Sequence, residues 1–550
     1  MVTVTSAPAG PDAQPAPAAA PRPLRLPVAF ALAVAAGLAQ LVAFPPYDLW
    51  FLAPVAVAAL AAAVHRRRLR AGFGLGFVAG AVLFLPLLSW TNLHTGWLPW
   101  VLLSLAEAAI VGLLGAASAW VSPLVDRWRP LWPALTGVLW VAQEALRDRA
   151  PFGGFPWGRL AFAQGDAPAL RLASLGGAPL VTFAVAVAGG ALVALAWRRF
   201  TPRAAPRPGL RPAALYAAAA AAAIAGPALI PAPDTAGRPT ATVAIVQGNV
   251  PRLGLEFNDQ RRRVLDNHAT ATERLAADVA AGRATQPDLV VWPENASDID
   301  PLRNADAAAR ISQATDAIGA PVLLGAVLRG PGPGQVRNAG LLWLPGTGAD
   351  LTQTYIKRHP VPFAEYVPMR RIARMVSTQV DRVTADFVAG DAPGIVRTGG
   401  PVVGDVICFE VAYDEVVRDT VTGGAQLLAV QTNNATFNDA EARQQLAMVR
   451  LRAVEHGRQA LMASTVGVSA FVDANGAVHQ ATTFNTAAVE LRDMTLGGPT
   501  TLATRVGPWP EVVLAVLALA ALAWAGARRR AGRRAGTAAA PPTSEHPEAR

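Results

Sequence analysis

The sequence predicts a polytopic α-helical membrane region joined to one α/β domain, and three observations support this fold class. Hydrophobic residues make up 52% of the 550 residues and charged residues only 16%, whereas soluble proteins carry roughly 25% charged residues. Many of the apolar residues are gathered into runs long enough to span a bilayer. Residues 240–495 differ, because short Val/Ile/Leu runs alternate there with helical stretches and Gly/Pro/Asn turns, a pattern typical of an α/β domain.

Eight apolar runs approach the roughly 20 residues that a membrane helix needs. They centre on 27–44, 49–64, 72–91, 98–121, 131–147, 178–197, 213–231 and 511–527. The fifth and seventh runs are the weakest, because Glu144 interrupts one, while the other is mostly alanine and contains Pro227. We therefore expect a membrane domain of seven helices over 25–235, a catalytic-type α/β domain over 240–495, and an eighth transmembrane helix over 508–527.

The distribution of arginine predicts the orientation of these helices. The connections after the second, fourth and sixth runs and the tail after the eighth are basic, whereas those after the first and third contain no Lys or Arg. By the positive-inside rule, both termini are then cytoplasmic and 240–495 lies on the extracytoplasmic face. The connection 148–177 disagrees, because it is expected outside and yet contains Arg149, Arg159 and Arg171. We expect these arginines to have a role other than topology.

The composition argues against several other classes of function. The net charge of +10 is compatible with nucleic-acid binding, but arginines clustered beside apolar runs are typical of membrane proteins, so we expect no nucleic-acid partner. One cysteine excludes an intramolecular disulfide framework and a multi-cysteine metal site, and we expect neither a metal nor a cofactor. Residues 1–24 are Ala/Pro/Gly-rich and predict a disordered tail. Residues 528–550 predict a basic or disordered cytoplasmic tail.

Three segments of 240–495 place a chemically capable residue directly after a strand-like run. Glu294 follows Asp-Leu-Val-Val-Trp-Pro, Lys357 follows Thr-Tyr-Ile and precedes a proline-rich loop, and Cys408 follows Val-Val-Gly-Asp-Val-Ile. Sheets of α/β domains commonly place their sites where strands end. Taken singly, each residue has an ordinary alternative: a solvated loop glutamate, a surface lysine and a small buried hydrophobic cysteine.

Taken together, the three residues predict an acyl-transfer site. A thiol with an ordinary pKa of about 8.5 needs a base or a nearby cation to become an effective nucleophile. Glu294 can accept the thiol proton, and Lys357 can stabilise the thiolate and an oxyanion; one such donor contributes roughly 3–4 kcal/mol of transition-state stabilisation. Glu365 and Glu410 are candidates for holding Lys357 and positioning an incoming amine, and either could instead be structural.

The order Glu294, Lys357, Cys408, with the residues around each, resembles the nitrilase superfamily over about 240–495. That resemblance implies a Glu–Lys–Cys triad in a four-layer αββα sandwich. With the apolar runs included, nearly the whole chain resembles the apolipoprotein N-acyltransferase family. Further matching segments are Gly154-Phe-Pro-Trp157, Val246-Gln-Gly-Asn249, Pro362-Phe-Ala-Glu365-Tyr-Val-Pro and Ile407-Cys-Phe-Glu410.

The family resemblance implies a ping-pong reaction in the cell (inner, cytoplasmic) membrane through a thioester on Cys408. The acyl donor would be a membrane phospholipid, and the acceptor would be the α-amino group of the diacylglyceryl-cysteine of an apolipoprotein. Two positions depart from the family pattern. Phe409 stands where Tyr is frequent, and Phe257 is the nearest aromatic residue where a Trp is frequent. Both keep an apolar ring, so we expect altered lipid packing with the chemistry retained.

Several other residues are assigned to the site. Asn338 and Phe409 are placed beside the triad, where they would position the substrates. Trp157, Arg159 and Phe257 are assigned to lipid contact, with Arg159 binding a phospholipid phosphate. Ordinary interfacial anchoring is the alternative for the aromatic residues.

Two further functions remain open from the sequence. One is a membrane-tethered, nitrilase-like amidase that uses the same triad to hydrolyse a small extracellular amide; release of free acid or ammonia would favour it. The other is a transporter or scaffold with a degenerate binding module. Few polar residues fall within the apolar runs, and the Glu–Lys–Cys set is intact, so the sequence favours an enzyme.

Overall fold

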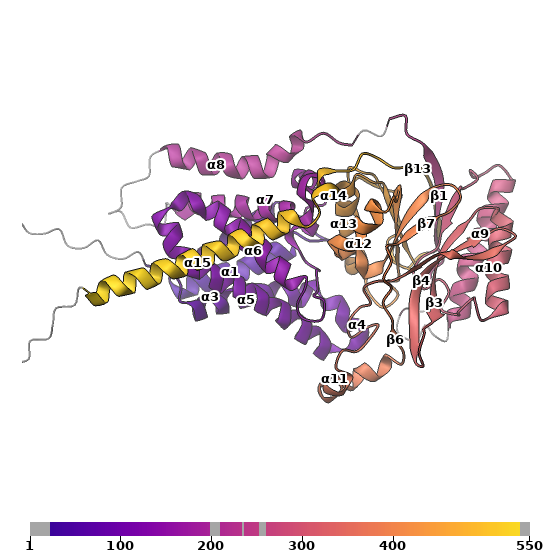
Figure 1. The fold of residues 1–550 in the computed structure, drawn as a ribbon, viewed down its shortest axis with the longest axis horizontal. Helices are drawn as coiled ribbons and strands as arrows, with labels where there is room; N and C mark the ends of the chain where they lie inside the picture. Colours follow the sequence, from indigo (N-terminus) through magenta and orange to yellow (C-terminus); the bar gives the residue numbers. More distant parts are fainter. Residues whose placement is uncertain (1–21, 198–209, 234–235, 252, 254–259, 539–550) are drawn as a thin grey trace, which may run out of the picture.

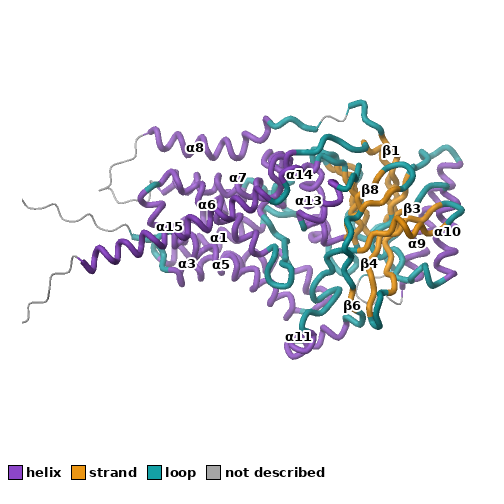
Figure 2. Tube along the Cα trace, in the orientation of Figure 1, coloured by secondary structure: helices purple, strands orange, loops and turns teal. Residues whose placement is uncertain are grey.

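The chain is divided between a bundle of apolar helices at one end and a two-sheet domain at the other (Figure 1). The computed structural model describes residues 22–197, 210–233, 236–251, 253 and 260–538. Figure 2 shows that the described strands all lie in the second part, and that one long helix returns from it along the bundle. That helix is α15 (Trp509–Ala538), which packs against the bundle helices.

A helix lies at each of the eight apolar runs. Besides α15 these are α1 (Leu26–Leu41), α2 (Leu52–Val64), α3 (Leu69–Leu87), α5 (Trp97–Arg127), α6 (Trp132–Arg147), α7 (Ala173–Ala196) and α8 (Leu210–Ala225). Within the described ranges, five helices are long and apolar enough to cross a membrane: α3, α5, α7 with the turn before it, α8 and α15. The helices α1 and α2 are apolar but shorter. The described part of the chain therefore agrees with a helical membrane domain, and the count of eight crossings stays a prediction.

Two sheets form the second part. The first has the order β13-β1-β2-β3-β4-β5, with β6 beside β4; the second has the order β12-β11-β10-β9-β8-β7. Strands of the first sheet are β1 (Thr240–Gln247), β2 (Leu289–Val291), β3 (Val322–Arg329), β4 (Gln335–Leu344), β5 (Gly348–Ile356), β6 (Asp386–Phe387) and β13 (Ala488–Thr495). Strands of the second are β7 (Ile395–Arg397), β8 (Val402–Ile407), β9 (Leu427–Thr432), β10 (Ala460–Ser464), β11 (Ala470–Val472) and β12 (Val478–His479). The neighbours β1, β2 and β3 are parallel, as are β8, β9 and β10. These strands are apolar runs because both of their faces are buried.

The two sheets face each other across an apolar core, in which Val243 and Leu323 of the first sheet join Val403 and Leu461 of the second. Helices α9 (Arg261–Ala280) and α10 (Ala305–Ile318) cover the outer face of the first sheet. Helices α12 (Asp414–Thr422) and α13 (Asp439–His456) cover the second sheet and continue its core into the helical bundle. The predicted αββα sandwich is confirmed.

The arginines of the connection 148–177 have partners within the described structure. Arg149 pairs with Glu511 at the start of α15, at 2.5 Å. Arg171 donates to two backbone carbonyl groups after α8, at 2.6 and 2.9 Å. Arg159 is buried among carboxylates. These contacts tie the connection to its neighbours and give its positive charges a structural role, as expected.

Candidate active site

Glu294, Lys357 and Glu365 meet at one end of the sandwich. The Lys357 ammonium donates to Glu294 Oε1 at 3.1 Å and to Glu365 Oε1 at 2.9 Å. Asn338, on β4, donates its side-chain amide to the same two oxygens, at 2.6 and 3.2 Å. Lys357 is only 2% exposed, so its charge is held away from water by these contacts. The strand ends that carry the predicted residues do converge.

A close backbone approach places Glu294 at this position. A Cβ atom on Gly325 of β3 would lie 2.4 Å from the carbonyl oxygen of Pro293 and 2.6 Å from Glu294 Cα. Only glycine permits strand β3 to pass so near the residues that follow β2. The second carboxylate oxygen, Glu294 Oε2, accepts from the backbone N–H of Asn433 at 2.9 Å. The carboxylate is therefore fixed from both sheets.

Cys408 lies at the turn from β8 into a short 3-10 helix, Cys408–Ala412. Its φ is +56°, in the left-handed region that non-glycine residues rarely adopt. Such strain persists only where the surroundings enforce it, and it is frequent at functional residues. Thr432 Oγ1 donates to the sulfur at 3.4 Å and Gln445 Nε2 at 3.6 Å. The side chain remains half-buried.

Charges and burial set the protonation of this group. Burial and the Glu294 carboxylate raise the pKa of the Cys408 thiol, and Lys357 opposes them. Burial alone would lower the pKa of Lys357, but the carboxylates of Glu294 and Glu365 outweigh it and raise that pKa well above its usual value. At neutral pH the resting site therefore holds a neutral thiol beside a permanent cation.

Glu410 occupies a different place from the one expected. Its carboxylate accepts from the Tyr355 hydroxyl at 2.9 Å and from the backbone N–H groups of Ile407, Arg358 and His359, at 2.9, 2.6 and 3.1 Å. It thus joins the turn at Cys408 to the backbone that follows Lys357. It holds the two chain segments in position and makes no hydrogen bond to the Lys357 ammonium itself.

Comparison with known proteins agrees with both parts of the chain. Residues 36–191 match the apolipoprotein N-acyltransferase N-terminal domain and residues 242–498 match carbon-nitrogen hydrolase. The apolipoprotein N-acyltransferase of Mycolicibacterium smegmatis is 42% identical over 88% of this chain and 83% of its own length. The chain belongs to the apolipoprotein N-acyltransferase family.

More distant members are similar over the same span. The apolipoprotein N-acyltransferases of Gloeobacter violaceus and Azotobacter vinelandii are each 32% identical, over 90% and 91% of this chain and 94% and 95% of their own. Among solved structures, an amidase from Nesterenkonia sp. AN1 is 19% identical, covers 46% of this chain and 93% of its own, and has a TM-score of 0.35. The family-model matches and the relatives at 32–42% identity show that the chain is an N-acyltransferase enzyme of the carbon-nitrogen hydrolase superfamily and a membrane protein.

The structure corrects the role predicted for Arg159. Its side chain is 2% exposed, and its guanidinium lies 2.7 Å from Asp414 and 3.3 Å from Asp148. A buried guanidinium already paired with carboxylates has no free face for a phospholipid phosphate. Arg159 instead joins the connection 148–177 to the N-terminus of α12.

Trp157 is also not placed on an exposed lipid-facing surface. It is buried, its indole N–H donates to Gln444 of α13 at 2.7 Å, and its ring stacks on Phe409 with centroids 5.9 Å apart. Phe409, next to Cys408, also stacks on Phe155 at 5.4 Å. These rings form an apolar wall between the proposed nucleophile and the helical bundle. Phe257 lies outside the described residues.

The sequence analysis missed the last residue of β9 and the residues directly after it. Thr432 and Asn433 contact the sulfur and Glu294, and the Asn434 amide donates to Glu441 Oε2 at 2.6 Å. Burial raises the pKa of Glu441 to about 8. The segment Gln-Thr-Asn-Asn at the end of the strand β9 was a usable signal, because it follows the same strand-end pattern as the other three segments.

Proposed function

We propose that this chain transfers an acyl chain from a membrane phospholipid, through a thioester on Cys408, to the α-amino group of the diacylglyceryl-cysteine of apolipoproteins. The observation that carries the proposal is the contact set that joins Glu294, Lys357 and Cys408. Two consecutive residues link the sulfur to Glu294: Thr432, the last residue of β9, donates to the sulfur, and Asn433 donates to Glu294. The family supplies the reaction class.

In the first half-reaction, Glu294 accepts the thiol proton as the sulfur attacks the ester carbonyl of the phospholipid. Lys357 stabilises the oxyanion, which contributes roughly 3–4 kcal/mol by analogy with other oxyanion donors. The intermediate collapses by breaking the bond to the glycerol oxygen, which takes the proton back from Glu294. The products are a lysophospholipid and the Cys408 thioester.

In the second half-reaction, the acceptor amine attacks the thioester and Glu294 accepts its proton. The C–S bond then breaks, and the sulfur recovers that proton from Glu294. Glu365 and Asn338 keep Lys357 and Glu294 oriented through both steps, because each contacts the cluster directly. Phe409 and the rings stacked on it would exclude water, which favours the amine over hydrolysis.

We also propose the topology that the arginines predict, with both termini cytoplasmic and the sandwich on the extracytoplasmic face. An exposed aromatic pair supports an opening at the bilayer surface. Phe152 and Phe363 are 42% and 44% exposed, and their rings meet edge to face at 5.7 Å. Aromatic side chains are enriched at this level of a membrane.

Intact-mass analysis tests the chemistry. The purified protein, in detergent with phospholipid, is expected to gain one acyl mass that hydroxylamine removes, while Cys408→Ser gains none. Because the chain has a single cysteine, a hydroxylamine-sensitive adduct locates the thioester. A diacylglyceryl lipopeptide should then discharge it as an N-acyl product.

Two results would contradict the proposal. One is a wild-type protein that remains unmodified while the N-acyl product accumulates, which would rule out the covalent route. The other is release of free fatty acid in place of N-acyl lipopeptide, which would indicate a hydrolase of the amidase type.

A further inference from the structure

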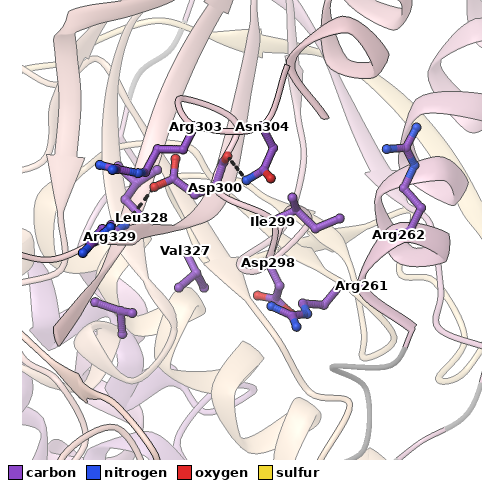
Figure 3. Close-up of a pocket in the computed structure, with 11 residues that line it drawn as sticks. Arg261, Arg262, Asp298, Ile299, Asp300, Arg303, Asn304, Val327, Leu328 and Arg329 are labelled. Carbon is purple, nitrogen blue, oxygen red and sulfur yellow. Dashed lines mark hydrogen bonds between the residues drawn. The ribbon is translucent and has the colours of Figure 1, made fainter. Parts of the chain in front are cut away.

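A cavity of about 750 Å³ adjoins the candidate active site and takes no part in the steps above. Its lining comes from the first turn of α9, the loop before α10 and the adjoining ends of β3 and β4 (Figure 3). A cavity of this size falls within the range of small-ligand sites. Several of the side chains that line it are charged, so a polar ligand suits it.

The cavity begins directly beside the residues that surround Glu294 and Lys357. Val327, on its wall, is paired across the sheet with Asn338, which contacts Glu294. Val336, also on the wall, lies two residues before Asn338 on β4, so the two side chains share one face of the sheet. Asp298 follows Glu294 by one short turn, and their charges interact. A substrate held at Glu294 can therefore extend into the cavity.

The cavity is lined by both signs of charge: Asp298 lies beside Arg261 on one side, and Asp300 lies near Arg303 and Arg329 on the other (Figure 3). Asp298 has both carboxylate oxygens buried and without a hydrogen-bond partner; burial raises its pKa to about 8, with Arg261 opposing and Glu294 adding to the rise. Figure 3 shows Arg303 and Arg329 together on the other side. Both are exposed, and neither guanidinium is ion-paired or hydrogen-bonded among the described residues. By contrast, Arg262 is paired with Asp306 at 2.6 Å.

We propose that this cavity receives the polypeptide of the acceptor immediately after its lipidated cysteine, and that Arg303 and Arg329 favour acidic side chains there. This inference rests on the proposed function. The Asp298 carboxyl would hydrogen-bond to backbone groups of the same segment, since a buried polar group without a partner is costly. The ligand is thus an extended peptide with acidic residues in its first positions.

The place of the cavity favours a peptide over a phospholipid headgroup. Helices α9 and α10 form the layer farthest from the helical bundle (Figures 1 and 2), and the cavity lies at their N-terminal ends. A headgroup is tied to the bilayer by its two acyl chains. The polypeptide of a lipoprotein leads away from the bilayer, so it alone is expected to reach this layer.

Acceptor discrimination tests the proposal. Two diacylglyceryl lipopeptides, one with Glu and one with Lys at the second to fourth positions, are compared by kcat/KM with one phospholipid donor. We expect the wild type to favour the acidic peptide by about fivefold, the effect of one exposed charge pair. Raised ionic strength should reduce this preference. The double variant Arg303→Glu, Arg329→Glu should favour the basic peptide.

The control is a double variant of equal charge change away from the cavity, Arg274→Glu, Arg397→Glu, whose side chains are also exposed. It should keep the wild-type preference. Thioester formation from phospholipid should be unchanged in both double variants. Unchanged discrimination in the cavity variant would overturn the proposal, and so would slower thioester formation with unchanged discrimination, which would indicate a headgroup site. If the wild type forms no thioester and acylates neither peptide, the proposed function itself fails.

Discussion

Two clusters of buried charge lie on either side of the turn at Cys408, and they differ in what they leave free. The cluster proposed to be catalytic, called the catalytic cluster below, consists of Glu294, Asn338, Lys357 and Glu365. The junction cluster consists of Asp148, Arg159, Asp414 and Arg452, where the helical bundle meets the sandwich. Most members of both clusters are buried, whereas Glu365 and Asp414 are partly exposed. The catalytic cluster acts electrostatically on a thiol, whereas the junction cluster contacts only other protein groups.

The junction cluster holds the backbone of the short helix that begins at Cys408. Arg452 donates to the backbone carbonyls of Val411 and Ala412, each at 2.8 Å, and to Asp414 at 2.7 Å. Burial opposes ionisation of Asp414, but Arg159 and Arg452 outweigh it and lower the pKa of that carboxyl. Burial of charged side chains alone therefore does not distinguish a catalytic cluster from a structural one. The distinguishing feature is a strained, half-buried nucleophile within reach of the charges.

Arg452→Met gives the largest expected effect and separates the two clusters. Arg452 also pairs with the buried Glu455, and removing one partner of a buried ion pair destabilises a protein by about 3–5 kcal/mol, because the remaining charge is left unpaired. We expect a marked fall in unfolding temperature in detergent, with thioester formation per folded molecule reduced less than tenfold. If stability were unchanged and thioester formation abolished, the junction cluster would have to be assigned to catalysis.

Lys357→Met tests the catalytic cluster, and here we expect the reverse of Arg452→Met: a large loss of rate with a smaller loss of stability. Loss of an oxyanion donor lowers rates by about 10²–10³-fold, so single-turnover release of lysophospholipid should fall by that factor. The unfolding temperature, measured on the same sample, should fall less than in Arg452→Met, because Asn338, Asn433 and the Val361 backbone N–H still donate to the Glu294 and Glu365 carboxylates. A rate within threefold of wild type would remove Lys357 from the mechanism.

The pH dependence of thiol alkylation measures the charges at Cys408 directly. Because burial and Glu294 raise the thiol pKa and Lys357 lowers it, Glu294→Gln should lower that pKa and Lys357→Met should raise it. At about pH 8, near the ordinary thiol pKa, alkylation by iodoacetamide should be faster than wild type in the first variant and slower in the second. Cys408→Ser supplies the blank. Shifts of equal sign would show that burial alone sets the thiol pKa.

The sequence predicted the catalytic cluster better than the junction cluster for a physical reason. Glu294, Lys357 and Cys408 each come directly or shortly after a strand, and strand ends in a packed sheet converge wherever the helices lie. The partners of Arg159 depend instead on how the bundle docks on the sandwich. Asp414 lies 255 residues away along the chain, and no local pattern connects the two. Arg159 therefore resembled a lipid-binding arginine.

The residues at the end of β9 and Gln445 of α13 were missed for a related reason. Thr432, Asn433 and Gln445 are types common in loops and on helix surfaces, so their identity alone indicates no chemistry. Gln445 reaches the sulfur because α13 packs across the second sheet and aims one buried face at the turn. Tertiary packing gives these side chains their role, and single-sequence patterns do not record it.

Thr432→Val gives the smallest expected effect and shows how far the catalytic cluster extends. The Thr432 hydroxyl donates to Cys408 Sγ, which lowers the thiol pKa, and also contacts Gln445 Oε1 at 2.7 Å. Valine keeps the shape and removes both contacts, which is worth about 1 kcal/mol, or about fivefold in thioester formation. Thr432→Ser keeps the hydroxyl and should stay within twofold of wild type. If valine and serine slow the reaction equally, the lost methyl packing explains the change, and the catalytic cluster ends at the residues that touch Lys357.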